Sequence, residues 1–219
     1  MKFKETKYGD LTGQTYIGDI YVSDSKLTSL EGAPKEVLGV FYCYRNNLTS
    51  LEHAPKIIRD DFDCSNNQLV SLKHAPKKVG KSFYCSSNQL TSLKGAPKIV
   101  NGDFYCSANK LRSLKYSPEK VKRSFSCGEN NLTSLKYSPK EVGENFYCAD
   151  NQLTSLEGVS KKIGGYFICK NNPVEHLEEE YQIRKENPNK SEIEIKIELI
   201  KQGFIKSEEL DGLQDIFFL

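Results

Sequence analysis

Several features of other protein classes are missing from this chain of 219 residues. The opening Met1 to Glu5 has no apolar run like that of a signal peptide, and no stretch approaches the roughly 20 apolar residues that span a bilayer. Cys-x-x-Cys pairs, which cluster the thiolates of many zinc sites, are also absent. The formal net charge is only +2. We therefore expect a soluble cytoplasmic protein without a bound metal or other cofactor.

Cysteine, by contrast, is present at a strictly regular spacing. Each cysteine follows a phenylalanine by two residues and precedes an asparagine by three. The seven cysteines, 21 residues apart, are Cys43, Cys64, Cys85, Cys106, Cys127, Cys148 and Cys169. A fixed period of about 20 to 50 residues indicates stacked units that bury their apolar faces against one another. The sequence therefore predicts a solenoid.

One unit, which we call a rung, reads Phe-x-Cys-x-x-Asn-x-Leu-x-x-Leu, then Ala or Ser and Pro. An earlier divergent rung contains Ile20, Val22 and Leu27 at the matching positions. The register predicts an N-terminal cap over residues 1–19, a solenoid of about eight rungs over 20–174, and a helical C-terminal cap over 175–219.

The residues of one rung predict its local structure. Around Phe104 and Cys106 apolar residues alternate with polar ones, the period of a half-buried strand. Phe and Cys then face the core, and the residue between them faces outward. Proline in the short return path disfavours a helix, so we expect extended convex segments. The repeated asparagine, such as Asn109, should pair with buried backbone groups of adjacent rungs.

These rungs resemble the leucine-rich-repeat family, whose pattern Leu-x-x-Leu-x-Leu-x-x-Asn/Cys-x-Leu aligns with Phe41, Cys43, Asn46 and Leu48. Compact 21-residue repeats of this kind look like those of bacteria, their phages and secreted bacterial effector ligases. The resemblance implies a curved solenoid that recognises a partner on its concave sheet. It does not extend to ligase activity, because the last 45 residues contain no cysteine nucleophile.

The cysteines have three interpretations. One thiol per rung on a straight line does not resemble a zinc site, and side chains of in-register strands run parallel rather than toward each other, as a disulfide requires. Free cysteine is frequently a small buried core residue. We favour reduced, buried thiols, which are typical of a cytosolic compartment.

The modest net charge conceals an asymmetry. Residues 1–174 carry 25 Lys and Arg against 17 Asp and Glu, whereas residues 175–219 carry 6 against 12. A basic body raises the question of nucleic acid. However, Lys35, Lys56, Lys77, Lys98 and Lys140 follow the prolines, on the convex return path, which we interpret as a solvated face. We therefore do not expect nucleic acid as a partner, and duplex DNA would be repelled by the concave face.

The outward positions of the predicted sheet are aromatic and acidic. Tyrosine offers a large rigid contact area, and acidic neighbours steer basic partners. Tyrosine also simply favours strands, so cross-strand packing is the alternative interpretation. The expected partner-binding residues are Tyr42, Tyr44, Asp61, Asp63, Tyr84, Asp103, Tyr105, Tyr147 and Tyr166. Arg45 and Lys170 are the only basic residues that we expect on this face.

Two further features lie outside the sheet. His53 and His74 share a column with Tyr116 and Tyr137, which suggests a lateral contact rather than a metal pair. In the tail, helices are expected around Leu177 and Tyr181, after the Ser191/Glu194 capping box with Ile193, Ile197 and Ile200 on one face, and from Ser207. For the second of these, the alternation of Ile193, Ile195, Ile197 and Leu199 leaves a strand as the alternative.

The sequence thus predicts a non-enzymatic module that binds a protein, with a basic surface on the partner, through the concave sheet. A phage-encoded or bacterial inhibitor or effector fits this pattern. The alternative is a structural, adhesive or self-assembling component that uses its C-terminal end, Asp215 to Leu219. No arrangement of nucleophile, base and orienting group suggests an enzyme.

Overall fold

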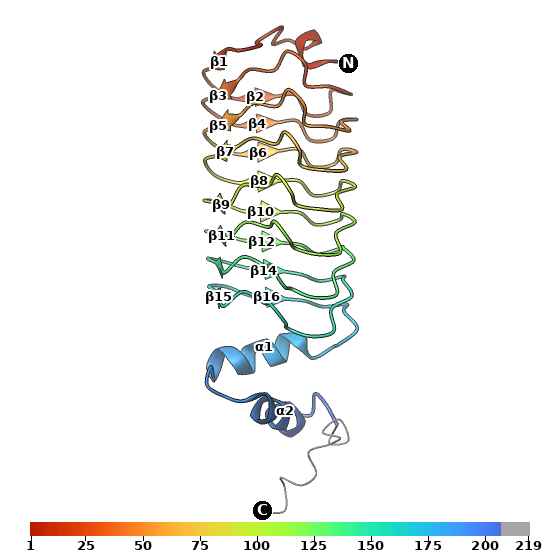
Figure 1. The fold of residues 1–219 in the computed structure, drawn as a ribbon, viewed down its shortest axis with the longest axis vertical. Coiled ribbons are helices and arrows are strands. Elements are labelled where there is room, and N and C mark those ends of the chain that lie inside the picture. The colour runs from red at the N-terminus through yellow and green to blue at the C-terminus, as the bar shows by residue number, and fades with distance from the viewer. Residues whose placement is uncertain (207–219) are drawn as a thin grey trace, which may run out of the picture.

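The computed structural model describes residues 1–206. It is a parallel β-solenoid of about seven turns with a 21-residue repeat, followed by two helices (Figure 1). The expected β-rich solenoid with a helical C-terminal part is confirmed. A short 3-10 helix, Phe3–Glu5, precedes the first strand.

One face of the solenoid is an eight-stranded parallel sheet. Equivalent residues pair across it, for example Phe104 with Phe83 on one side and Phe125 on the other. Its strands are β2 (Ile20–Tyr21), β4 (Phe41–Tyr42), β6 (Phe62–Asp63), β8 (Phe83–Tyr84), β10 (Phe104–Tyr105), β12 (Phe125–Ser126), β14 (Phe146–Tyr147) and β16 (Phe167–Ile168).

The return path also contains strands, which form two four-stranded parallel sheets along one side. The first contains β1 (Thr15–Tyr16), β3 (Glu36–Val37), β5 (Ile57–Ile58) and β7 (Lys78–Val79). The second contains β9 (Ile99–Val100), β11 (Lys120–Val121), β13 (Glu141–Val142) and β15 (Lys162–Ile163). A β-branched residue in each rung, such as Val121, points into the core at this corner. The expected extended segments are therefore paired strands, interrupted between β7 and β9.

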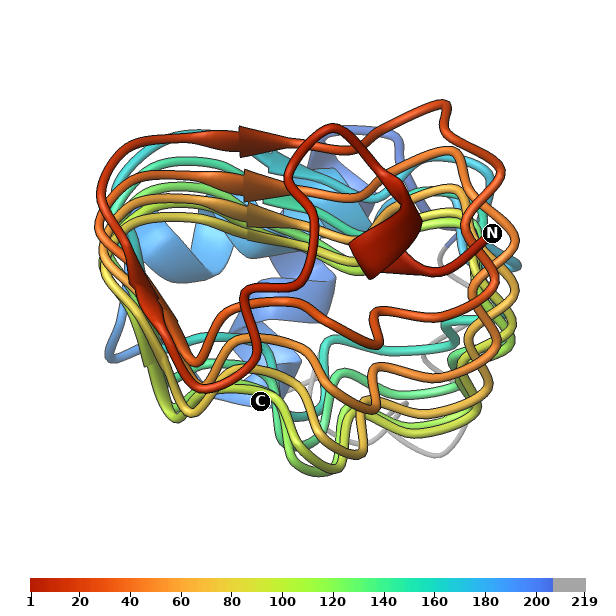
Figure 2. The same cartoon turned by 90° about the horizontal axis from the view of Figure 1, so that it is seen from above.

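The stack is bowed. In Figure 2, which looks along the stack, the first and last rungs are displaced toward the side of the eight-stranded sheet relative to the middle rungs. The eight-stranded sheet thus lies on the concave side, and the Leu- and Pro-containing return path lies on the convex side.

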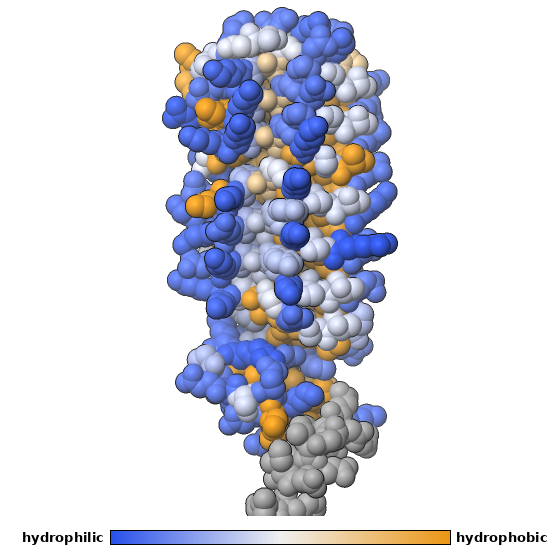
Figure 3. Space-filling view, in the orientation of Figure 1, coloured by the Kyte–Doolittle hydropathy of each residue, from blue (hydrophilic) through white to orange (hydrophobic). Residues whose placement is uncertain are grey.

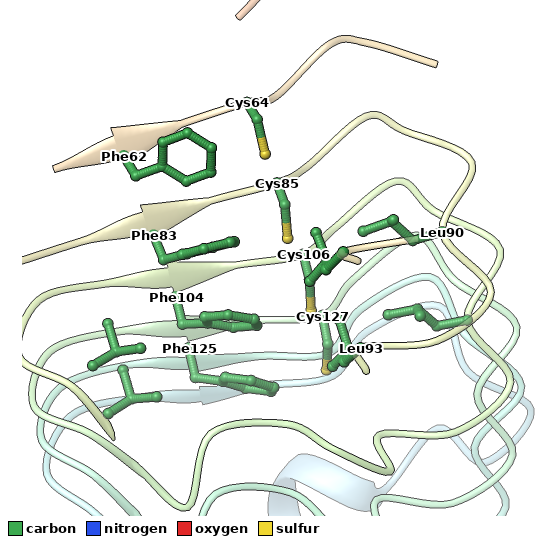
Figure 4. Packing of buried hydrophobic residues seen from close by; sticks show 14 of the residues in the cluster. Phe62, Cys64, Phe83, Cys85, Leu90, Leu93, Phe104, Cys106, Phe125 and Cys127 are labelled. Carbon is green, nitrogen blue, oxygen red and sulfur yellow. The ribbon is translucent and has the colours of Figure 1, made fainter. Parts of the chain in front are cut away.

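The core consists of stacked columns, one residue type per column (Figure 4). The phenylalanine rings of successive rungs from Phe41 to Phe167 lie 5.0 to 6.2 Å apart between centroids. The cysteines form the next column and are free and buried. Phe104 and Cys106 are both fully inaccessible to solvent. Each rung thus completes the core of its neighbours.

Burial of the thiols predicts how stability changes with pH. It raises the pKa of six of them, Cys43, Cys64, Cys85, Cys106, Cys127 and Cys148. The folded state therefore keeps thiols protonated that ionise in the unfolded chain at about pH 8.5. This contribution to stability is present in full below about pH 8.5 and is lost as the pH rises toward the folded-state values.

We expect urea midpoints to fall as the pH rises above about 8.5, and the thiols of the native protein to resist a thiol reagent until it unfolds. Replacement of the central thiol, Cys106→Ala, provides the control, since it should make the fall with pH shallower. Rapid labelling of all seven thiols under native conditions would contradict burial of the column.

The asparagine ladder expected from the sequence is confirmed. Asn109 Oδ1 accepts from the amide of Leu90 at 2.9 Å, and its Nδ2 donates to the carbonyls of Cys85 and Cys106, both at 3.1 Å. The other rung asparagines repeat this pattern: Asn46, Asn67, Asn88, Asn130, Asn151 and Asn172. Each amide therefore joins two rungs at the corner where the sheet ends.

Two columns of the rung have left-handed backbone conformations. The residue before each asparagine has φ between 50° and 56°, as in Arg45 and Ala108. The second column contains His53, His74, Tyr116 and Tyr137, with glycine at the equivalent positions 32, 95 and 158. This column is a turn, because glycine is the residue that adopts positive φ most readily. The histidines thus lie at convex turns, which the sequence alone did not show.

Both ends of the eight-stranded sheet are covered by the chain itself. At the N-terminal end the ring of Phe3 lies 6.1 Å from that of Phe41, and Tyr8 Oη accepts from the amide of Tyr21 at 3.0 Å. At the other end α1 (Leu177–Glu186) places Tyr181 4.6 Å from the Phe167 ring. Glu178 Oε1 accepts from the amide of Cys169 at 2.7 Å.

The second helix, α2 (Glu192–Lys201), begins at the expected capping box. Ser191 Oγ accepts from the amide of Glu194 at 3.3 Å. The buried side chains are Ile195 and Leu199, whereas Ile193, Ile197 and Ile200 are only partly buried. The expected apolar face is therefore only partly right. Ile200 packs against the cluster that α2 forms with Ile183 and Ile205, but Ile193 and Ile197 do not belong to it.

The expected third helix from Ser207 and the apolar end from Asp215 lie outside the described residues. Within residues 1–206, no helix combines the length and the apolar character needed to cross a membrane.

Candidate functional site

The outward residues of the concave sheet form one row, which we call the tyrosine row. Its members, one per strand from β2 to β16, are Tyr21, Tyr42, Asp63, Tyr84, Tyr105, Ser126, Tyr147 and Ile168. The four central tyrosines, 42, 84, 105 and 147, are half-buried rather than fully exposed. Their neighbours in the row cover part of each ring, and the remaining ring surface faces solvent.

The rings are grouped in pairs. Tyr21 and Tyr42 lie 5.6 Å apart and Tyr84 and Tyr105 lie 5.3 Å apart between centroids, both edge to face. Tyr44 extends the first pair, with its ring 6.3 Å from that of Tyr42. Burial, together with the nearby Asp103, raises the pKa of Tyr84 to about 12. The Tyr84 phenol therefore remains a neutral hydrogen-bonding group at physiological pH.

The column on one side of the tyrosine row is a hydrogen-bond ladder between rungs. Asp61 Oδ1 accepts from the amide of Ser82 at 2.7 Å, and Asp103 Oδ1 accepts from the amide of Ser124 at 3.0 Å. Asp19, Ser82, Ser124 and Asn145 play the same part in their rungs. Sequence reasoning missed this structural role. Its signal was an Asp, Ser or Asn immediately before most of the core phenylalanines, with Val40 and Tyr166 as the exceptions.

Asp103 differs from the sequence expectation. The residue is only 6% exposed. Its Oδ2 accepts from Tyr84 Oη at 3.2 Å and lies 3.4 Å from Arg123 Nη1. Asp103 is thus an internal partner of Tyr84 rather than an exposed charge.

Two basic residues near this face were also missed. Arg123 bonds Glu144 at 3.2 Å as well as Asp103, and Lys81 bonds Asp60 at 2.8 Å. Both lie two positions before a core phenylalanine, next to the acceptor column. The concave face is therefore less acidic than the sequence suggested. Its carboxylates without an ion pair are concentrated at one place, and Lys81 acts on one of them, Asp61, only from beyond ion-pair distance.

The carboxylates at this place are Asp61 and Asp63, on either side of Phe62 in β6. Within residues 1–206, neither carboxylate lies within 4.0 Å of a basic side chain. Asp63 Oδ1 accepts from the amide of Ser65 at 2.8 Å, yet burial raises the pKa of this carboxyl. Burial and the fields of both carboxylates also raise the pKa of Tyr42. The two carboxylates thus lie between the tyrosine pairs.

The remaining two predicted residues form a separate group. Tyr147 Oη accepts from Asn145 Nδ2 at 2.9 Å, and Tyr166 is 73% exposed at the end of the sheet. Ser126, bonded to Ser107 at 2.6 Å, separates this group from Tyr105. The structure therefore brings together Tyr42, Tyr44, Asp61, Asp63, Tyr84 and Tyr105, which we call the concave cluster.

The concave cluster offers aromatic ring surface, phenol hydroxyls and two carboxylates. Six of the seven thiols have a raised pKa, so they are not thiolate nucleophiles at neutral pH. Among the described residues there is no group of three or more His, Cys, Asp or Glu side chains placed to hold a metal ion.

Comparison with known proteins finds neither a family model nor a curated protein that matches the chain.

Proposed function

We propose that this protein is a non-enzymatic interaction module that binds a basic segment of a partner protein across the concave cluster. The observation that carries the proposal is the Asp61 and Asp63 pair, which has no ion pair within the described chain and is flanked by edge-to-face tyrosines. An arginine or lysine of the partner would supply the missing positive charge.

The shape of the face suits an extended segment. Strand spacing of about 4.8 Å and side-chain alternation give the sheet surface regular positions for successive side chains. Tyrosines supply rigid contact area and hydrogen-bonding hydroxyls, and they also attract cations to their ring faces. Tyr84 and Tyr105 would flank the aliphatic part of a basic side chain while the carboxylates bind its head.

The family, the biological source and the cellular location of the protein are part of the same proposal. The Phe-x-Cys-x-x-Asn-x-Leu rungs support the proposal that this is a compact protein of the leucine-rich-repeat type, phage-encoded or bacterial, that acts in the cytoplasm as an inhibitor or effector. Buried, reduced thiols suit such a reducing compartment.

Self-assembly is the second candidate, and the described residues do not favour its simplest form. Both edge strands of the concave sheet are covered, at β2 by Tyr8 and at β16 by α1. End-to-end addition of strands would have to displace these contacts. Self-association through residues 215–219 concerns a part of the chain outside the described residues.

Fluorescence anisotropy with a labelled decapeptide of alternating Arg and Ser tests the proposal. We expect the wild type to bind and Asp61→Asn/Asp63→Asn to weaken binding at least roughly tenfold, because two charges are lost. Asparagine can still accept the amide bonds of Ser82 and Ser65, so the fold should remain. Tyr84→Ala/Tyr105→Ala should weaken binding to a similar extent.

The matched control is Tyr116→Gly/Tyr137→Gly, which removes two exposed tyrosines from the convex turns. Its affinity for the peptide should equal that of the wild type. Equal affinity for all four proteins would overturn the proposal and leave the tyrosine row as cross-strand packing.

A further inference from the structure

The convex face of the solenoid has a charge pattern opposite to that of the concave cluster. From Cys64 to Gly102 there is no Asp or Glu. The same span contains Lys73, Lys77, Lys78, Lys81, Lys94 and Lys98. Figure 3 shows this side of the molecule, which is mostly hydrophilic, with scattered hydrophobic side chains.

The lysines form two columns parallel to the stack. The first, immediately after the prolines, contains the exposed Lys35, Lys56, Lys77, Lys98, Lys140 and Lys161, with Glu119 as its one acid. The second contains the exposed Lys73, Lys94, Lys115 and Lys136 in four successive rungs, with Glu31, Glu52 and Glu157 at the equivalent positions of the outer rungs. Backbone hydrogen bonds from Lys56 to Lys35 and from Lys77 to Lys56, both 2.9 Å, show that the first column is stacked directly. Its members in the described chain have no ion pair within 4.0 Å.

Aromatic rings lie between the two lysine columns. Tyr116 and Tyr137, at the left-handed turn positions, are 50% and 54% exposed. Lys115 Nζ lies 5.3 Å from the Tyr116 centroid, and Lys136 Nζ lies 5.8 Å from that of Tyr137. Each exposed ring thus has a cation beside it.

A hollow of about 440 Å³ lies on the same face, one rung before Tyr116, at the break between β7 and β9. The rungs before and after Gly95 have His74 and Tyr116 at the equivalent position. Because Gly95 has no side chain, the hollow stays open there. Of its apolar lining, Ala75 and Ala96 are partly exposed, whereas Leu72, Pro76 and Pro97 are buried beneath the surface. Lys77 and Lys98 lie on its wall. An apolar surface with two cations beside it matches a flat, uncharged ring attached to an anionic backbone.

From these observations we infer, contrary to the sequence-based interpretation of these lysines as a solvated face, that the convex face binds single-stranded nucleic acid, with phosphates along the lysine columns and bases on Tyr116, Tyr137 and in the hollow beside Gly95. A positively charged groove with interleaved aromatic rings is the usual means of binding such strands without sequence preference. An acidic protein segment would satisfy the lysines but would leave the rings unused. The inference does not depend on the concave cluster.

Fluorescence anisotropy with labelled oligo(dT) and oligo(U) of about 15 nucleotides tests the inference. We expect both to bind, with log K falling by about 0.7 per phosphate contact for each decade of salt. For four lysine contacts, that is roughly a 50-fold loss between about 50 and 200 mM salt. Lys77→Gln/Lys98→Gln should make this slope shallower by about 1.4.

Tyr116→Gly/Tyr137→Gly should weaken binding between about 5-fold and 150-fold per stacked base lost. Glycine occurs at this turn position in three other rungs, so the fold should tolerate it. Two controls should bind as the wild type does: Lys185→Gln/Lys201→Gln, which removes the same charge from the helices, and Tyr84→Ala/Tyr105→Ala on the concave side.

Absence of binding at low salt would overturn the inference. The inference would also be overturned if unlabelled polyglutamate displaced the labelled strand as well as unlabelled oligo(dT) does and Tyr116→Gly/Tyr137→Gly bound the strand like the wild type. That result would indicate an acidic protein as the partner instead. Tyr84→Ala/Tyr105→Ala is a test variant in the peptide assay and a control in the nucleic-acid assay, and Tyr116→Gly/Tyr137→Gly is the reverse. The results can therefore contradict one proposal and leave the other standing.

Discussion

Asn130→Ala is expected to destabilise the protein by about 2 to 4 kcal/mol, while Asn131→Ala, at the adjacent residue, changes stability by less than about 0.5 kcal/mol. Asn130 is buried and its Oδ1 accepts from the amide of Leu111 at 3.0 Å. Its Nδ2 donates to the carbonyls of Cys106 and Cys127, both at 3.1 Å.

The expected loss follows mainly from the stranded amide of Leu111. The carbonyl of Cys106 also accepts from Asn109, and that of Cys127 also accepts from Asn151, so each keeps one partner. Leu111 N–H loses its side-chain acceptor in a buried position, which costs about 1 to 3 kcal/mol, and the small cavity adds to this. Urea denaturation followed by far-UV circular dichroism measures both variants. Equal stability of the two would contradict the ladder.

Phe104→Ala is expected to cost about 3 to 5 kcal/mol. The ring is fully buried, and it stacks between Phe83 at 5.6 Å and Phe125 at 5.9 Å. Its removal leaves a cavity in the middle of the column that the rigid stack cannot close. Phe104→Leu, which introduces the residue usual in leucine-rich repeats, should cost less than about 1.5 kcal/mol if the neighbours repack.

A central defect should also affect cooperativity. Because each rung contacts only its neighbours, the stability of a solenoid depends on the interfaces between rungs. Weakening one central interface should let the two halves unfold separately, which lowers the apparent denaturant slope m. An unchanged slope with a small shift of the midpoint would mean that the phenylalanine column does not couple the rungs.

Periodicity made the fold predictable, because residues 21 apart must occupy equivalent environments in a stack. The inward Phe and Cys, the asparagine ladder and the helix start at Ser191 all followed from local rules. The side strands did not, since a two-residue strand such as Lys120–Val121 is too short to show a period. Nor did the buried face of α2, which depends on Ile183 and Ile205 rather than on α2 itself.

The sequence predicted which residues of the candidate site lie on the outer face of the sheet, but not how their side chains interact. The sequence identified Tyr84 and Asp103 as outward residues, and the structure pairs them with each other and with Arg123. Such pairing depends on which rotamers meet across adjacent rungs, and a repeat pattern does not contain that information. The same limit concealed the hollow at Gly95, which depends on the side chains of neighbouring rungs.

The central claim is that the concave cluster recognises a protein partner. A pull-down from a lysate of the native host, with retained proteins identified by mass spectrometry, tests it most directly. The experiment compares three proteins in parallel: the wild type, the concave variant Tyr84→Ala/Tyr105→Ala and the convex variant Tyr116→Gly/Tyr137→Gly. Nuclease is added to all samples. We predict a protein that the wild type and the convex variant retain and the concave variant loses. Retention of the same proteins by all three would contradict the claim.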